Sequence, residues 1–530
     1  MGTEPLYLRS DVAIEPLIDR WLAWAHMLSP ATGALNIANR YIKIMDSYVA
    51  APQLHASAIQ DPKMRGGPFI DLGGKRVDEI AALLSETKKR RAASIELAKA
   101  IKDAYALVKE QADGHALDKI YGRLPAPLRG YAELYYSISG AAELRVFEPL
   151  LYRSRYYEPS AQSARLARLE GDHRPFAMST PRLRDPATFD FARPFADPCY
   201  DALAALRWQP QPLDAIAESL LLESGETDRF RDFLTPEPPA IAARPPLAAT
   251  RWRYFGHACV LVETPAGKSV LTDPFIGYPQ RNGIPRFTLA DLPERIDYVT
   301  ITHNHLDHVQ LETLLALRSR IDTVVLPVGS GALEDPSLRL ALEAAGFSRV
   351  IELDCLERAG SGDVAITALP FLGEHADLGI RTKAAFHVDA AGLTMVFAAD
   401  SNNLEPRLYE LLREAIGAID ILFIGMECEG APLSWVYGPL LPRPLERAKD
   451  QSRRLNGSDY PRALNVVQTL GCKQVCVYAM GLEPWTTFIS SIEYDENAVQ
   501  VRASNALVAA CEDLGIPAGR LYGQAEGTAP

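Results

Sequence analysis

The run THNHLDH at positions 302–308 is the feature that most restricts what this 530-residue chain can fold into. It follows a β-branched segment and precedes an apolar helical pattern, so we place it in a strand-to-helix loop, where α/β sheets carry their sites. His303 and His305 are two residues apart at the strand end, so both side chains project to one side and can hold one metal ion. Asp307 and His308 follow where the chain turns into the helix and can reach a second ion. The run therefore predicts a dinuclear metal site.

The chain divides into two halves of different sequence texture. Prolines are frequent over 236–250, and because proline lacks a backbone donor and disfavours helix in the residue before it, this segment is predicted to be an extended linker. Before it, helical patterns such as 34–49 and 78–111 dominate. After it, short β-branched segments alternate with helical ones, which indicates an α/β layer fold. We therefore predict a mostly helical N-terminal domain over 1–235 and an α/β catalytic domain over 251–530.

The motif and its surroundings resemble the metallo-β-lactamase superfamily, of which HxHxDH is the hallmark. The segment 255–263 and the LTDPF that follows it resemble the opening strands of that superfamily, in which an aspartate such as Asp273 braces the metal loop. Asp400 ends the strand pattern FAAD and matches the aspartate that bridges two metals in the family. The resemblance implies an αββα sandwich over 251–530.

Two departures from that superfamily bear on the choice of metal. Its zinc hydrolases add a histidine in the loop after the motif, where this chain offers Glu374 and His375 side by side, and adjacent residues rarely point the same way. They add another near the last strands, but no histidine follows His387 here, and Glu483 is the only comparable donor. We take Glu374 as the ligand and keep His375 as its rival. The resulting set of three imidazoles and three carboxylates favours iron or manganese over zinc.

With this ligand order and total length, the whole chain resembles the diiron β-hydroxylases of nonribosomal peptide biosynthesis. The resemblance implies a site of two iron ions, oxo-bridged when oxidised, with O2 as co-substrate. It implies hydroxylation of the β-carbon of an amino acid that a carrier protein holds as a thioester. On the matching positions, one iron would be held by His303, His305 and Glu374, the other by Asp307 and His308, and Asp400 would bridge the ions or complete the second site.

Two further residues are assigned to the surroundings of the metals. Glu427 ends a strand pattern towards the same face of the sheet. It is our candidate catalytic carboxylate, one that supports the ligands or moves when substrate arrives, and a surface acid is the competing interpretation. His257 is expected to support the site without binding metal.

The resemblance also implies the partners of the reaction. The substrate would arrive on an aminoacyl-loaded peptidyl carrier domain of a nonribosomal peptide synthetase. Two external electrons are needed per turnover, and because the sequence carries no flavin or nicotinamide motif, a separate reductase or ferredoxin is expected. The family is usually homodimeric, and the N-terminal half would mediate the dimer, receive the carrier and cover the pocket.

Charge and composition argue against other classes. With 55 Lys and Arg against 67 Asp and Glu, the net charge of −12 is unfavourable for binding nucleic acid. No run reaches the ~18 apolar residues of a membrane span. The seven cysteines show no paired spacing and suit a reducing compartment. We therefore expect a cytoplasmic protein with neither nucleic-acid nor membrane partners.

Two alternatives to the oxygenase are considered. One is a dinuclear zinc hydrolase of the same fold, acting on an ester, thioester or lactone, in which the metals lower the pKa of a bridging water. It requires His375 as a ligand and an unusual donor for the second metal. The other is a non-enzymatic scaffold with a decayed site, against which the complete run at 302–308 argues.

Overall fold

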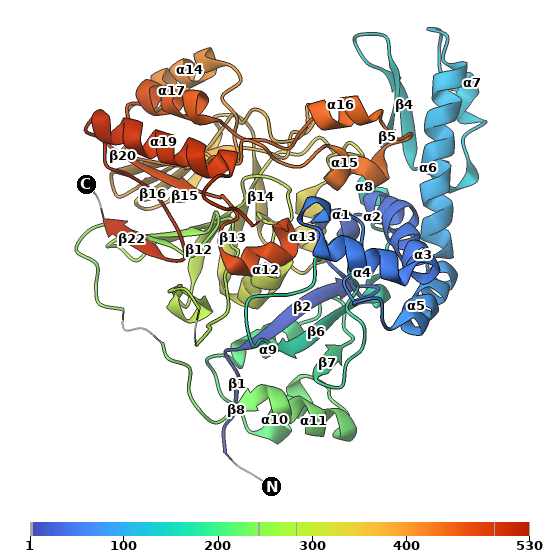
Figure 1. Ribbon diagram of the computed structural model, residues 1–530, viewed down its shortest axis with the longest axis horizontal. Helices are drawn as coiled ribbons and strands as arrows, with labels where there is room; N and C mark the ends of the chain where they lie inside the picture. Colours follow the sequence, from blue (N-terminus) through green and yellow to red (C-terminus); the bar gives the residue numbers. More distant parts are fainter. Residues whose placement is uncertain (1–3, 242–243, 282, 492, 529–530) are drawn as a thin grey trace.

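Two seven-stranded sheets form the centre of the C-terminal half of the structure, a computed structural model that describes residues 4–241, 244–281, 283–491 and 493–528 (Figure 1). The first sheet has the order β14-β13-β12-β11-β10-β9-β22, with β11 to β14 parallel and the remaining pairs antiparallel. Its strands are β9 (Arg251–Tyr254), β10 (Val260–Glu263), β11 (Ser269–Thr272), β12 (Ile296–Thr300), β13 (Ile321–Pro327), β14 (Val350–Leu353) and β22 (Ala525–Thr528).

The second sheet has the order β15-β16-β17-β18-β19-β20-β21. The pairs from β15 to β18 are antiparallel, and the pairs from β18 to β21 are parallel. Its strands are β15 (Arg358–Ser361), β16 (Val364–Leu369), β17 (Ala385–Ala390), β18 (Leu393–Phe397), β19 (Ile421–Gly425), β20 (Gln474–Tyr478) and β21 (Ala518–Arg520).

The two sheets face each other across one apolar core, and helices cover their outer faces. The rings of Trp252 on β9 and Phe423 on β19 lie edge to face, 5.4 Å apart, and belong to this shared core. This arrangement confirms the predicted αββα sandwich. The helices of this half are α12 (Leu311–Leu317) and α13 (Leu338–Ala344) on the first sheet, α14 (Pro406–Ile416), α17 (Tyr460–Leu470) and α19 (Val499–Asp513) on the second, and the short α15 (Ser434–Tyr437), α16 (Arg447–Ser452) and α18 (Thr487–Ser490).

The N-terminal half contains the predicted helices and also a four-stranded sheet of order β3-β2-β6-β7, which the sequence patterns did not indicate. Strand β2 (Val12–Ile18) is buried along its whole length, so it shows no alternation of polar and apolar residues. The other strands are β3 (Trp21–Leu22), β6 (Gln162–Arg168) and β7 (Thr188–Phe191), with the short pair β1 (Tyr7–Leu8) and β8 (Leu234–Thr235).

The predicted helix 78–111 is two helices, α5 (Val77–Arg90) and α6 (Ala92–Gln111), that meet at Arg91. The buried guanidinium of Arg91 forms ion pairs with Asp19 (2.6 Å) and Glu158 (2.9 Å), so contacts from distant segments fix the break. The remaining helices of this half are α1 (Ala25–Leu28), α2 (Pro30–Asn36), α3 (Ile42–Ala50), α4 (Pro52–Gln60), α7 (Asp118–Tyr121), α8 (Glu148–Leu151), α9 (Cys199–Ala205), α10 (Leu213–Ser219) and α11 (Ser224–Phe230), with a π-helical turn (Ile37–Tyr41) between α2 and α3.

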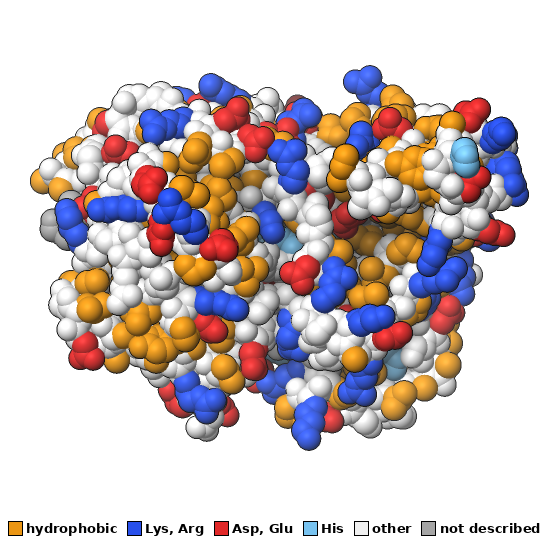
Figure 2. All heavy atoms as spheres, turned by 90° about the horizontal axis from the view of Figure 1, so that it is seen from above, with side chains coloured by type: hydrophobic (Ala, Val, Ile, Leu, Met, Phe, Trp, Pro, Cys, Tyr) orange, Lys and Arg blue, Asp and Glu red, His pale blue; other side chains and the backbone are white. Residues whose placement is uncertain are grey.

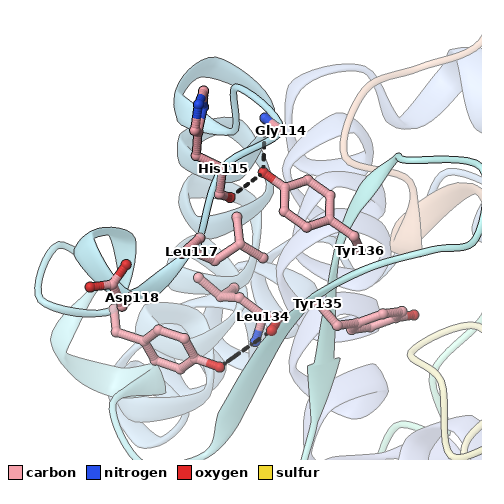
Figure 3. A pocket seen from close by; sticks show the side chains of 9 residues that line it. Gly114, His115, Leu117, Asp118, Leu134, Tyr135 and Tyr136 are labelled. Carbon is pink, nitrogen blue, oxygen red and sulfur yellow. Dashed lines mark hydrogen bonds between the residues drawn. The ribbon is translucent and has the colours of Figure 1, made fainter.

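An arm made of α6, α7 and the hairpin β4 (Ala132–Tyr136) and β5 (Ala142–Val146) projects from the N-terminal half (Figure 1). Tyrosines attach the hairpin to α7 and to the connection between α6 and α7, around a shallow surface hollow (Figure 3). The hydroxyl of Tyr136 donates to the carbonyl of His115 (2.9 Å), and that of Tyr121 accepts from the amide of Leu134 (2.9 Å). These tyrosines therefore hold the arm together.

The two halves pack through α12. All seven residues of this helix are buried, with the first sheet on one side and β2 and α9 of the N-terminal half on the other. The predicted linker 236–250 contains neither helix nor strand in its described part, and residues 242–243 lie outside the described residues. Among the helices of the described residues, none is long and apolar enough to cross a membrane.

Candidate metal centre and substrate cavity

The predicted metal loop joins β12 to α12, and Asp273 at the end of β11 fixes its shape. Asp273 is fully buried and accepts hydrogen bonds from the backbone amide of Thr302 (2.7 Å) and its hydroxyl (2.6 Å). Its carboxylate also lies 2.9 Å from Nδ1 of His308, and the Thr302 hydroxyl lies 3.0 Å from Nδ1 of His303. Because Nδ1 of each imidazole is engaged here, each Nε2 is left to face the interior of the site.

The first group of potential ligands consists of His303, His305 and Glu374. Their donor atoms all lie within 4.8 Å of one another, and Nδ1 of His305 is 3.1 Å from a carboxylate oxygen of Glu374. All three side chains are buried. The structure therefore brings together the three residues that the sequence assigned to one metal.

Asp400 lies between the histidines of this first group and His308. One of its carboxylate oxygens is 3.2 Å from Nε2 of His308 and 3.7 Å from Nε2 of His303. These three residues form a second group within 4.8 Å. The carboxylate of Asp400 thus contacts a histidine predicted for each of the two metal ions.

Asp307 approaches the cluster from the side of His257. A carboxylate oxygen of Asp307 is 3.3 Å from Nε2 of His257, and these residues form a third group with His308. Burial raises the pKa of Asp307, but the neighbouring imidazoles outweigh it and hold that pKa below its ordinary value. Glu483, the donor that stands in place of a last histidine, lies outside these three groups and instead accepts hydrogen bonds from Tyr254 and the backbone amide of Gly523.

The adjacent residues Glu374 and His375 point to different neighbours. Glu374 has a left-handed backbone (φ +64°) and reaches His305, whereas Nδ1 of His375 is 2.9 Å from the hydroxyl of Tyr437. That hydroxyl is also 3.3 Å from Nε2 of His305. His375 belongs to none of the three groups found among the described residues. Tyr437, on α15, was missed by the sequence analysis because nothing in its local sequence marks it.

Buried donor atoms without partners make this cluster suited to cations. In the described part of the chain, Nε2 of His303, Oε2 of Glu374 and Oδ1 of Asp400 are buried and have no hydrogen-bond partner. Burial lowers the pKa of His303 well below its ordinary value, and burial together with Asp400 raises that of Glu374 well above its own. Unpartnered buried polar groups are costly. Two metal ions fit this donor set, because they would satisfy these atoms at once.

A cavity of about 550 Å³ opens onto the cluster where the two halves of the chain meet. Figure 2 shows the molecule from above the view of Figure 1, with charged side chains of both signs spread over this face. The N-terminal half contributes Trp24 and Met178 to the cavity wall, and Lys63 and Arg65 also line it. The wall from the C-terminal half includes the metal-loop residues and the apolar side chains Leu306, Val436, Leu455, Met480 and Ile489.

Glu427 also lines this cavity, just beyond the end of β19. It accepts hydrogen bonds from Nε2 of Gln500 (3.0 Å) and from the hydroxyl of Tyr494. Its side chain is partly accessible because it faces the cavity. Glu427 therefore lies at the wall of the cavity beside the cluster, and its role stays a prediction.

A family described as the diiron non-heme β-hydroxylase N-terminal domain matches residues 7–238, and the β-lactamase superfamily domain matches 251–430. The 4-amino-L-phenylalanyl-[CmlP-peptidyl-carrier-protein] 3-hydroxylase of Streptomyces venezuelae is 40% identical over 526 residues, which are 97% of this chain and 98% of that protein. The crystal structure of CmlA, a diiron β-hydroxylase from Streptomyces venezuelae, matches with a TM-score of 0.93 and 39% identity, over 99% of this chain and 100% of that one. A UPF0173 metal-dependent hydrolase of Anaeromyxobacter is 31% identical, but over only 22% of this chain and 40% of its own.

The fold and the site define a metallo-β-lactamase-fold protein built to hold two metal ions. The comparisons, which extend over both halves, show that the chain belongs to the diiron non-heme β-hydroxylase family. It is a non-haem diiron enzyme that uses two iron ions and O2, and the comparisons support this prediction over the zinc hydrolase alternative.

Proposed function

We propose that this enzyme uses O2 to hydroxylate the β-carbon of an amino acid that a peptidyl carrier protein holds as a thioester. The observation that carries the proposal is the cavity of about 550 Å³, which joins a carboxylate-rich cluster of unpartnered donors to an apolar wall. Such a wall suits an apolar or aromatic amino-acid side chain. The name of the relative from Streptomyces venezuelae, which describes a carrier-bound phenylalanine derivative, agrees with this chemistry.

We also propose the assignment of the metal ligands. His303, His305 and Glu374 would hold one ion, Asp307 and His308 the other, and Asp400 would be shared. The distances within the three groups support this set. Glu374 belongs to one of these groups and His375 to none of those found among the described residues, which supports Glu374 over its neighbour as the ligand.

The residues of this chain would prepare the substrate for the reaction. Iron, when bound, supplies the activation of O2 and the oxidation of the carbon–hydrogen bond. Trp24, Met178 and the apolar residues opposite them would hold the substrate side chain and exclude water from the cluster. The N-terminal half (1–235) would cover the pocket and receive the carrier, and the catalytic half (251–530) would hold the ions, with 236–250 as the linker.

The electron donor and the oligomeric state belong to the same proposal. Hydroxylation with O2 requires two electrons from outside, and a reductase or ferredoxin would supply them. We expect a homodimer. Size-exclusion chromatography with light scattering tests the dimer, and the rate of hydroxylation with ferredoxin and its reductase, compared with dithionite, tests the donor.

The decisive experiment combines metal content with turnover. Purified protein should contain about two irons per chain and should convert an aminoacyl carrier, starting with 4-amino-L-phenylalanyl, to its β-hydroxylated form only when O2 and a reductant are present. Separate Glu374→Ala and His375→Ala variants, with iron counted after each, test the ligand assignment, and only the first should lose iron through lost ligation. Tightly bound zinc with no iron, together with thioester hydrolysis, would overturn the proposal.

A further inference from the structure

The carboxylate of Glu427 faces the substrate cavity without a counter-charge. Its two hydrogen-bond donors, the hydroxyl of Tyr494 and the amide of Gln500, are both neutral. No Lys, Arg or His forms an ion pair with Glu427 within the ranges that the structure describes. Burial, opposed in part by these two hydrogen bonds, raises the pKa of Glu427 to about 7.

The other buried or paired carboxylates of this cavity have basic neighbours. Glu493 forms an ion pair with Arg65, and Asp307 lies 3.3 Å from an imidazole nitrogen of His257. Glu374 and Asp400 each lie within 3.2 Å of a histidine. Glu427 has no basic neighbour of this kind among the described residues. An enclosed carboxylate is nevertheless the kind of group that a nearby cation stabilises most. A cationic group of the substrate would provide the positive charge that Glu427 lacks.

We propose that Glu427 binds the α-ammonium group of the aminoacyl thioester and makes the enzyme selective for an amino acid whose nitrogen is free over one whose nitrogen is acylated. The inference rests on the proposed function. In an aminoacyl thioester with an apolar side chain, the α-ammonium is the only cation, and it is attached to the carbon next to the β-carbon. Tyr494 and Gln500 donate hydrogen bonds to the carboxylate, so that it is oriented before the substrate arrives.

Position also favours this role. Glu427 lines the same cavity as Asp400 and Asp307, and it is close enough to them for their charges to contribute to its raised pKa. In a substrate held through its ammonium group at Glu427, only the α-carbon would separate the nitrogen from the β-carbon, so the reacting carbon would stay in the cavity that the cluster lines. Glu427 would thus contact the substrate, and the set of residues proposed to bind iron stays the same.

The test compares Glu427→Gln with the wild type on two carriers: the aminoacyl carrier that is turned over best, and its N-acetyl derivative. The wild type should prefer the free amine by at least about 10-fold in kcat/KM. The variant should lose about 10- to 100-fold on the free amine, the value of a hydrogen bond to a charged group, and little on the N-acetyl substrate. Its iron content should equal that of the wild type. Glu429→Gln is the matched control, because Glu429 is an exposed carboxylate of the same cavity and its removal should keep the preference.

Three results would count against the proposal. If the preference persists in Glu427→Gln, Glu427 does not recognise the ammonium group. If the variant loses iron and both substrates slow equally, Glu427 belongs to the metal site. If the variant does not fold, the wild type still decides, because dissociation constants for the two carriers that differ by less than about threefold would overturn the proposal. A wild type that hydroxylates no aminoacyl carrier refutes the proposed function itself, and this inference with it.

Discussion

Replacing Asp273 with asparagine should release iron without touching a ligand. Asp273 offers one oxygen to the backbone amide of Thr302 and the other to the Thr302 hydroxyl and to Nδ1 of His308. Because the hydroxyl gives its one hydrogen to Asp273, it can act only as an acceptor towards His303, so Nδ1 of His303 must carry a hydrogen. One carboxylate therefore sets the tautomer of two imidazoles, and it leaves Nε2 of both free for metal.

Asparagine can fill this position in two ways, and each has a cost. If its amide nitrogen faces the Thr302 hydroxyl and His308, Nδ1 of His308 must accept a hydrogen bond, so its own hydrogen moves to Nε2, and Nε2 can then no longer bind metal. If the amide turns over, its nitrogen meets the backbone amide of Thr302, and a buried donor is left unpaired at a cost of about 1–3 kcal/mol. The arrangement that leaves Nε2 of the histidines free for metal therefore costs about 1–3 kcal/mol more in the variant. Iron should then bind about 5- to 150-fold more weakly.

The measurement is competition for iron between the protein and a chelator of known affinity. Asp297→Asn is the matched control, because Asp297 also accepts a backbone amide, that of Ser269 (3.0 Å), on the neighbouring strand and has no contact with the metal loop. The control should change thermal stability but not iron affinity. Iron affinity in Asp273→Asn within twofold of the wild type would refute the argument that this carboxylate selects the ligating tautomers.

Three further predictions concern residues around the site and between the halves. Tyr437→Phe removes the hydroxyl that contacts His305, so iron affinity should fall by about 10-fold or more in the same competition assay, while a phenylalanine variant of the exposed Tyr121 should not change it. Arg174→Met leaves Glu312 buried without its 2.8 Å partner, so the free energy of unfolding should fall by about 3–5 kcal/mol in denaturant titration, and adding Glu312→Gln should recover part of the loss. Burial raises the pKa of Glu148 from 4.5 to about 7, so the folded state binds more protons than the unfolded one over that range, and this group lowers stability by about 3 kcal/mol as pH rises through it. Glu148→Gln should remove that part of the slope between pH 4.5 and 8, and an unchanged slope would show that Glu148 titrates normally.

The parts of the site that lie close together in sequence could be predicted from the sequence. His303, His305, Asp307 and His308 share one strand-to-helix loop, and the period of the strand alone places the first two on one side. Asp400 lies 92 positions from His308 and was found only because it ends a strand in the pattern of a known superfamily. The local chemistry of the loop and the resemblance together therefore gave a correct view of the fold, and the ligands that they name stay a prediction.

The features that were missed depend on contacts between distant segments. Tyr437 lies 132 positions from His305, on a helix of four residues whose sequence is ordinary. The break between α5 and α6 has neither proline nor glycine, and Arg91 is held there by Asp19, 72 positions away. Strand β2 is buried on both faces and contains Pro16, so neither alternation nor strand propensity marked it. Sequence patterns report what one segment does alone, and these positions are fixed by a second segment.

The helix that follows the metal loop shows how far the two halves depend on each other. Glu312 at the start of α12 binds Arg174, which also reaches Glu15 on β2, so an ion-pair chain runs from the metal loop into the N-terminal sheet. Because α12 is buried on every side, neither half could leave it without exposing apolar surface to water. The same N-terminal half supplies Trp24 and Met178 to the substrate cavity. The proline-rich segment 236–250 thus separates the halves along the sequence but not in packing, and the N-terminal half supports the metal loop as well as covering the cavity.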